Sequence, residues 1–149
     1  MEAAMLAAAI FWYHGRPPIL LDLVSTKGDD DHVVALFKEG NRWGAVSKTN
    51  HAVLRYRDPI FRDVRELALS YFNEYFLHDG VKTLRTYSRP FDLRRFGHEW
   101  LVAKENLFVI TDALDASPHT RIMNAEQIRN LRKADRIERK TGRVVDWKK

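Results

Sequence analysis

The stretch between Asp29 and Ser47 constrains the fold of this chain more than any other. It reads DDDHVVALFKEGNRWGAVS and holds two strand-like runs, residues 33–37 and residues 42–47, separated by Glu39-Gly40-Asn41. Glycine supplies the positive φ angle that a tight turn between two strands needs. The pattern therefore predicts a β-hairpin with His32 at its entrance.

The length and composition limit the chain to a small number of classes. With 149 residues, of which 45% are hydrophobic, it can form one domain with a sizeable core. It has no cysteine, which excludes disulfides, thiolate zinc sites and a thiol nucleophile from its own residues. Residues 1–124 carry 16 basic and 16 acidic side chains, whereas residues 125–149 carry 9 and 4. We expect a core domain over residues 1–123 and a basic helical tail over residues 124–149.

The N-terminal segment predicts a helix over residues 1–14, ended by Gly15 and the following Pro17-Pro18. It is apolar almost all the way round, so we expect it to be buried on most faces. It is too short to span a bilayer, and Glu2 stands where a signal peptide has a basic residue, so the expected location is cytoplasmic. No capping residue precedes the first amides, which favours an N-terminally truncated chain.

The rest of the chain alternates between strand and helix patterns. Residues 19–24 (ILLDLV) predict a central strand, and residues 50–57 an irregular segment or short strand. Apolar residues three or four apart predict a helix over residues 60–77, and a strand is expected over residues 81–87. Residues 104–114 predict another helix. A further helix opens at Asn124, where Gln127 is placed for a capping box.

His32 is the strongest candidate for chemistry, and two interpretations of it stay open. Its imidazole could act as a general base if an acceptor holds the second ring nitrogen, or it could be a structural histidine at a strand start. Asp29, Asp30 and Asp31 lack the spacing of a calcium loop, so no metal site is expected. They are more typical of a solvated acidic loop, which could hold the ring or raise the pKa of His32.

Four features of the first 47 residues together resemble the core of transglutaminase-like proteins, in the papain-related cysteine-triad superfamily. The resemblance rests on the alanine-rich helix that ends at a glycine, the apolar strand, the histidine that opens a strand, and the strand R-W-G-A-V-S. It covers about a third of the chain. It implies an α+β fold, with a buried N-terminal helix packed on a mainly antiparallel sheet and additional helices from the C-terminal half.

The family places a cysteine at the start of the buried helix, a histidine at a strand start and an aspartate on the next strand. The cysteine position falls at or just before Met1, and this chain has none. The aspartate position falls near Ser47, with Asn50 the nearest other side chain able to accept a hydrogen bond from the imidazole. The resemblance thus implies a vestigial catalytic set of His32, Ser47 and Asn50. Acyl transfer needs an activated thiolate, so the chain as given is expected to be catalytically silent.

A non-catalytic binding module is the alternative. Asp31, Lys48 and His51 could line a peptide cleft beside His32, or belong to an ordinary polar loop. In the tail, Arg129, Arg132, Lys133 and Arg136 recur at three- or four-residue steps and would share one helix face, where they could meet nucleic-acid phosphates or remain solvated. Acidic residues are interleaved with them. No cofactor and no membrane partner is expected, and self-association through an apolar patch stays possible.

Overall fold

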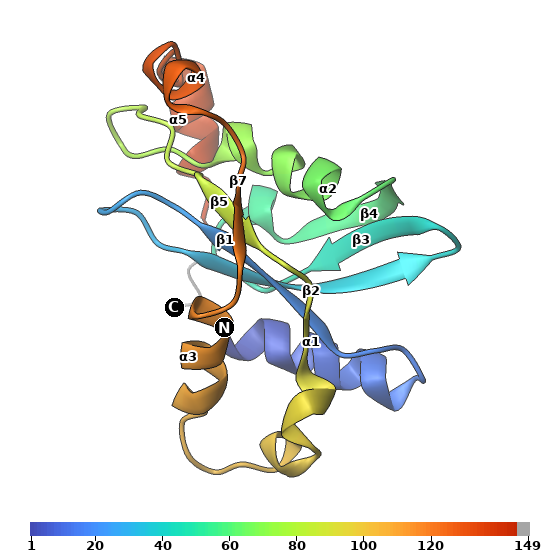
Figure 1. The fold of residues 1–149 in the computed structure, drawn as a ribbon. Helices are drawn as coiled ribbons and strands as arrows, with labels where there is room; N and C mark the ends of the chain where they lie inside the picture. The colour runs from blue at the N-terminus through green and yellow to red at the C-terminus, as the bar shows by residue number, and fades with distance from the viewer. Residues whose placement is uncertain (146–149) are drawn as a thin grey trace.

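The structure is a computed structural model, and it describes residues 1–145. Within these residues, seven strands form one antiparallel sheet with helices on both faces (Figure 1). The strands are β1 (Ile19–Val24), β2 (His32–Glu39), β3 (Arg42–Val46), β4 (Tyr56–Phe61), β5 (Thr86–Ser88), β6 (Phe91–Asp92) and β7 (His119–Arg121). Their order is β4-β3-β2-β1-β5-β7, and β6 pairs with the first half of β1. The predicted α+β class is confirmed.

The remaining elements are short helices that connect and cover these strands. The α-helices are α1 (Glu2–Tyr13), α2 (Val64–Ser70), α3 (Phe108–Asp115), α4 (Ala125–Arg129) and α5 (Arg136–Gly142). Four 3₁₀ turns join them, namely η1 (Ala52–Leu54), η2 (Phe72–Glu74), η3 (Leu93–Phe96) and η4 (Glu99–Leu101). No helix among residues 1–145 is both long and apolar enough to span a bilayer.

The predicted hairpin is formed by β2 and β3. Gly40 has a φ of +54°, which gives the tight turn between them. The register places Phe37 opposite Gly44, and the phenyl ring lies over the space that a side chain at position 44 would fill. A methyl group at Gly44 would stand 2.5 Å from Cζ of Phe37 and 2.9 Å from the carbonyl oxygen of Arg57.

Gly44→Ala is therefore expected to destabilise the protein by about 2 kcal/mol, because the added methyl group overpacks a buried strand pair. Urea denaturation followed by tryptophan fluorescence measures the loss. Phe37→Leu shortens the obstructing side chain, so the penalty of Gly44→Ala should shrink in that background. An equal penalty in both backgrounds would show that the ring is not the obstacle.

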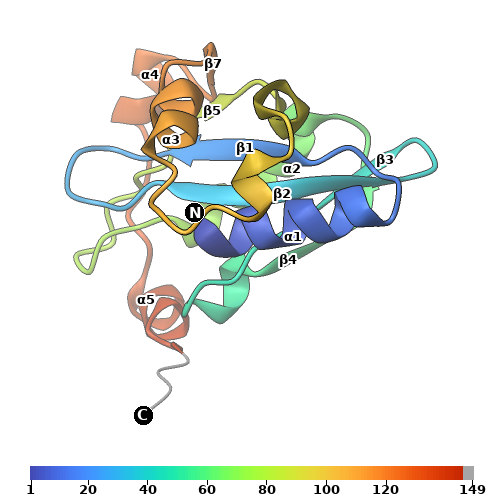
Figure 2. The same ribbon diagram turned by 90° about the horizontal axis from the view of Figure 1, so that it is seen from below.

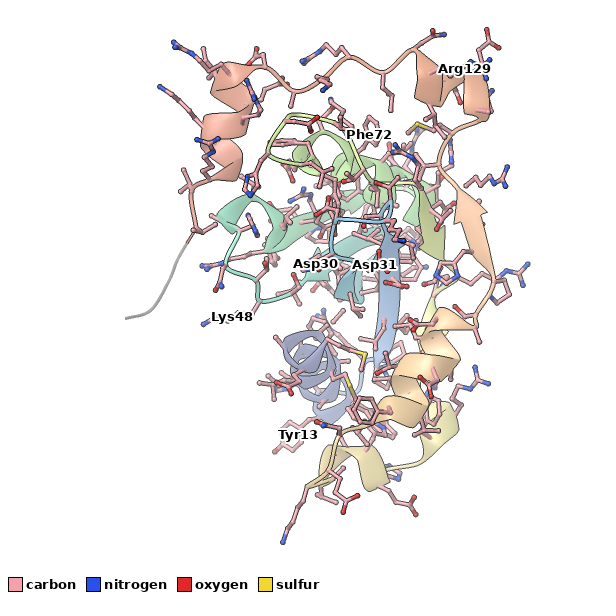
Figure 3. All side chains as sticks on the ribbon, turned by 90° about the vertical axis from the view of Figure 1, so that its left-hand side faces the viewer. Tyr13, Asp30, Asp31, Lys48, Phe72 and Arg129 are labelled. Atoms are coloured by element: carbon pink, nitrogen blue, oxygen red, sulfur yellow. The ribbon has the colours of Figure 1, made fainter. Side chains whose placement is uncertain are left out.

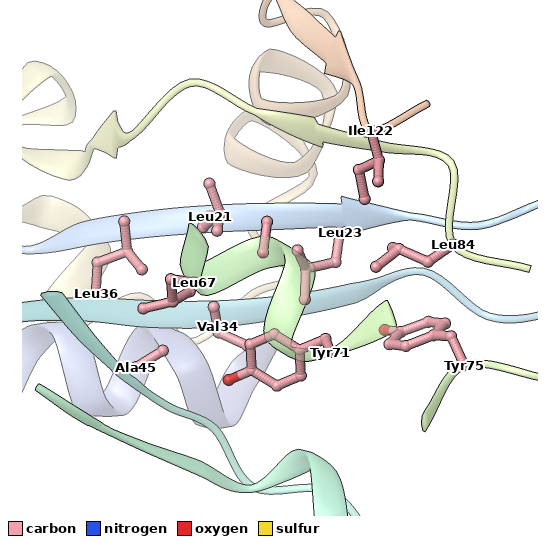
Figure 4. Packing of buried hydrophobic residues seen from close by; sticks show 11 residues of the cluster. Leu21, Leu23, Val34, Leu36, Ala45, Leu67, Tyr71, Tyr75, Leu84 and Ile122 are labelled. Atoms are coloured by element: carbon pink, nitrogen blue, oxygen red, sulfur yellow. The ribbon is translucent and has the colours of Figure 1, made fainter. Parts of the chain in front are cut away.

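The central strand β1 divides the core into two layers. Leu21 and Leu23 face α2 and join a cluster with Tyr71 (Figure 4). Leu20 faces the other way, into a cluster with α1 and α3. Because successive strand residues point to opposite faces, the apolar run 19–24 is buried on both sides. The central strand predicted there is confirmed.

Helix α1 crosses the second face of the sheet, as the view from below shows (Figure 2). It packs through Ala4 and Ala8, whose small side chains allow close approach to β1 and β2. The expectation that this helix is buried on most faces is wrong, since Leu6, Ile10 and Tyr13 are 64%, 50% and 87% exposed. The sheet covers only one side of a helix that is apolar all round.

Three element boundaries differ from the sequence prediction. The helix expected over residues 60–77 is confined to α2, between Val64 and Ser70, and a 3₁₀ turn, η2, follows it. It starts late because Ile60 belongs to β4 and the Asp63 side chain caps the helix by accepting from the Glu66 amide. The strand expected over residues 81–87 is confined to β5. The helix expected over residues 104–114 starts at Phe108.

The tail forms two helices. Asn124 and Gln127 make the predicted capping box at the start of α4, which is confirmed. A second capping box, between Asp135 and Glu138, begins α5 in a new direction. The prediction that Arg129, Arg132, Lys133 and Arg136 share one helix face is therefore wrong, because residues 130–135 interrupt the helix.

Candidate functional site

His32 and Ser47 meet at one end of the β2–β3 pair. Nε2 of His32 lies 2.8 Å from Oγ of Ser47, fifteen residues along the chain. Ser47 is buried, and its Oγ also lies 3.3 Å from the carbonyl oxygen of Leu54. Asn50 lines the same cleft, but the group that holds the imidazole is Ser47.

Two tautomers of the His32 imidazole fit the hydrogen bonds of Ser47. A hydroxyl has one proton, so Ser47 donates either to the Leu54 carbonyl or to Nε2 of His32. In the first arrangement Oγ accepts from Nε2–H, and the lone pair of the neutral ring lies on Nδ1. In that tautomer Nδ1 is the base and Ser47 is the orienting acceptor.

Burial lowers the pKa of His32 to about 4, so the imidazole is neutral at pH 7. The Leu54 carbonyl opposes this effect, while the positive charges of the Met1 amino terminus, His51 and Arg57 add to it. The expectation that the neighbouring aspartates raise the pKa is wrong. Their carboxylates have other hydrogen-bond partners: Asp31 accepts from the Ser25 amide at 2.7 Å, and Asp29 accepts from the Thr83 hydroxyl.

The pair borders a polar cleft of about 430 Å³. The structure brings Asp31, Lys48, Asn50 and His51 together with His32 in its lining, as the binding hypothesis expects. Sequence reasoning missed five further lining residues, which come from η1, from the end of η2 and from the tail: Leu54, Glu74, Tyr75, Phe76 and Gly142.

The basic residues of the tail lie outside the lining of this cleft. Two of them are paired with acids: Arg132 binds Glu138 at 2.7 Å, and Lys133 binds Asp79 at 2.8 Å. These exposed pairs reduce the positive charge available to a phosphate backbone.

The first turn of α1 reaches the same end of the sheet as the pair. The Met1 amino terminus is close enough to lower the pKa of His32, and Lys48 lines both this cleft and a second cavity that contains Met1. Figure 3 shows Lys48, Asp30 and Asp31 on this side of the molecule. Strand alternation nevertheless places His32 and Ser47 on the α2 face of the sheet, whereas α1 covers the other face. The first turn of α1 and the imidazole therefore lie at the same end of the sheet but on opposite faces of it.

A half-buried arginine holds two of the segments that line the cleft, η1 and η2. Arg57 donates to the Val53 carbonyl at 2.8 Å and to Oγ of Ser70 at 2.9 Å, and it forms an ion pair with Glu74. Its guanidinium lies 3.9 Å from the ring centroid of Tyr71. These contacts fix η1, whose last carbonyl lies within hydrogen-bond distance of the Ser47 hydroxyl. No local sequence signal points to them, because the partners on α2 and η2 are 13 and 17 residues away.

A second buried polar group lies on the opposite face of the sheet. Oδ2 of Asp22 is 3.3 Å from Nε2 of His119, whose Nδ1 donates to the Ser117 carbonyl at 2.7 Å. The Asp22 amide donates to Oγ of Ser88. Burial raises the pKa of the Asp22 carboxyl, which is 3% exposed. These contacts tie β7 and β5 to the central strand.

Neither a protein-family model nor a curated protein sequence matches this chain. Among residues 1–145, no three histidine or acidic side chains are grouped as ligands for a metal ion.

Proposed function

We propose that this chain is a transglutaminase-like scaffold, in which His32 and Ser47 are the base and the orienting group of a cysteine-dependent acyl-transfer site. The contact between Nε2 and Oγ supports the proposal most directly, because in the tautomer in which Oγ accepts from Nε2–H the lone pair lies on Nδ1. The helix start that would carry the nucleophile lies at the same end of the sheet. With no cysteine in the sequence, the chain is silent in this reaction.

The chemistry that the pair can support follows from the tautomer. A thiol at the start of α1 would pass its proton to Nδ1, and the thiolate would add to an amide carbonyl carbon. Nδ1–H would return the proton to the leaving amine as the thioester forms, and water or a second amine would then release the acyl group. Ser47 would hold the ring throughout, as the acceptor of Nε2–H.

A cysteine supplied at the start of α1 is expected to become reactive. Met1→Cys, expressed behind a short leader, should have a thiol pKa below the usual value of roughly 8.5, because the helix N-terminus favours the thiolate, and a thiolate beside His32 in turn favours the protonated imidazole. A companion variant carries the cysteine directly before Met1. The pH dependence of alkylation by iodoacetamide measures the thiol pKa.

The matched controls are Leu6→Cys, which places an exposed thiol on the same helix, and each reactive variant combined with His32→Ala. We expect an ordinary thiol pKa for Leu6→Cys, and a higher thiol pKa in each His32→Ala combination than in the matching start-site variant, because only the effect of the helix N-terminus remains there. If neither start-site cysteine has a lowered pKa, or if removing the imidazole leaves that pKa unchanged, the proposal fails.

Peptide binding without catalysis is the second candidate, and the polar cleft around His32 favours it. Its volume falls within the range of small-molecule and side-chain pockets. A cleft ligand should remain bound when salt is raised and when the tail is neutralised, whereas nucleic-acid binding by the tail would weaken steeply with salt. The cytoplasmic location and self-association remain predictions.

A further inference from the structure

The end of the described tail lies against the cleft that contains His32. Gly142, the last residue of α5, is part of the cleft lining. Its carbonyl oxygen is 3.2 Å from Nδ1 of His51, and Val145 forms an antiparallel bridge with His51. One wall of the cleft is therefore built by a segment more than ninety residues away from His51 in sequence.

This contact depends on a glycine. A methyl group at Gly142 would stand 2.7 Å from Cζ of Phe76 and 2.9 Å from Cε2. Phe76 also lines the cleft, so the missing side chain lets α5 approach the aromatic wall of the site. The close approach is local to the end of the helix, because Ile137 in its first turn is 72% exposed.

The other end of the segment is fixed to the loop after η2. The Ala134 amide donates to the Gly80 carbonyl at 2.8 Å, and Lys133 pairs with Asp79. Ala134 is buried, whereas no residue of α5 is. A short helix with exposed polar contacts belongs to the part of a structure that opens locally at small free-energy cost.

We propose that residues 134–145, which we call the C-terminal strap, are a regulatory cover of the His32 cleft. The strap pivots at Ala134 and closes the cleft through Gly142 and His51. The proposal concerns regulation of the site proposed above and rests on that site being a ligand cleft. When the strap opens, the wall formed by Gly142 leaves, and the cleft becomes accessible from the side of Phe76.

Hydrogen exchange and imidazole modification of the full chain test the strap without any ligand. In the unmodified protein, amides of α5 should exchange through local opening at least about 100-fold faster than those of β1 and β2. Gly142→Ala should raise the rate at which diethyl pyrocarbonate modifies His32 about tenfold, since the added methyl group overpacks the closed state. His51→Ala, which removes the polar contact instead, should raise that rate as well.

Lys140→Ala is the matched control, because it changes an exposed residue of the same helix and should leave both measurements unchanged. The strap is ruled out if α5 exchanges only as slowly as the central strands. It is also ruled out if neither Gly142→Ala nor His51→Ala raises the rate of His32 modification above that of the unmodified protein. Neither measurement uses a thiol. Failure of the cysteine experiment with a positive result here would leave a covered cleft of another function, and the reverse pattern would leave an uncovered acyl-transfer scaffold.

Discussion

Replacing Arg57 with methionine is expected to lower the free energy of unfolding by about 3 kcal/mol, because the ion pair is half-buried and the guanidinium also donates to several other acceptors. The side chain is only 13% exposed, and it donates to Val53, Ser70 and Glu74. Methionine fills part of the volume but leaves these acceptors unpaired. Burial already raises the pKa of Glu74 against the opposing effect of Arg57, so loss of the cation should raise that pKa further. Urea denaturation at pH 7 measures the change.

Two comparisons distinguish the half-buried ion pair of Arg57 and Glu74 from an ion pair on the surface. Arg62 pairs with Glu66 at 3.4 Å, but its side chain is 75% exposed, so Arg62→Met should change stability by less than about 0.5 kcal/mol. Removing both buried charges, by Arg57→Met with Glu74→Leu, should recover part of the loss, because no unpaired carboxylate remains. Equal effects of Arg57→Met and Arg62→Met would refute the buried role of Arg57.

The elements that the sequence predicted well are those specified by neighbouring residues. The β2–β3 hairpin follows from two strand-like runs and a glycine that takes a positive φ, and β1 follows from a compact apolar run. The capping box at Asn124 was likewise readable, because both partners lie within one turn. In each case the physical determinant lies within a few residues of its effect.

The segment from β4 to η2 shows why periodicity failed elsewhere. Its aromatic and aliphatic residues do fall three or four apart, but Ile60 and Phe61 belong to a strand. Pro59 lies within β4, and a proline is tolerated there because β4 is the edge of the sheet, where a missing amide leaves no ladder hydrogen bond unmade. The Asp63 cap then starts the helix four residues later than the apolar pattern suggests. Edge position is a tertiary property that no local pattern contains.

In the candidate site, too, the contacts between segments that are close in sequence were predictable, and those made by tertiary packing were not. The contact between His32 and Ser47 was predictable because the hairpin brings its two ends together. The contacts of Arg57 with α2 and the position of Gly142 in the cleft lining were not predictable, because tertiary packing alone brings these segments together. The direction of the His32 pKa was also misjudged. The sequence shows three adjacent aspartates, but it does not show that they turn toward Ser25 and Thr83 while the imidazole is buried.

Acid is expected to destabilise this protein through His32. The pKa of this imidazole is about 4 in the folded state and about 6.5 when it is exposed, so between these values the unfolded chain binds a proton that the folded chain does not. Stability from this group is fully present above pH 6.5 and falls as the pH drops toward 4. The integrated loss is about 3 kcal/mol, measured as the difference in unfolding free energy between pH 7 and pH 4.

His32→Gln tests the assignment, because glutamine can still donate to Ser47 but does not titrate. The variant should keep most of its unfolding free energy between pH 7 and pH 4. Its unfolding free energy should therefore approach that of the unmodified protein as the pH falls to 4. His14→Gln, at an exposed position, should follow the unmodified curve throughout. An undiminished acid loss in His32→Gln would place the sensitive group elsewhere. It would also remove the evidence that a buried neutral imidazole, held by Ser47, stands ready as a base at neutral pH.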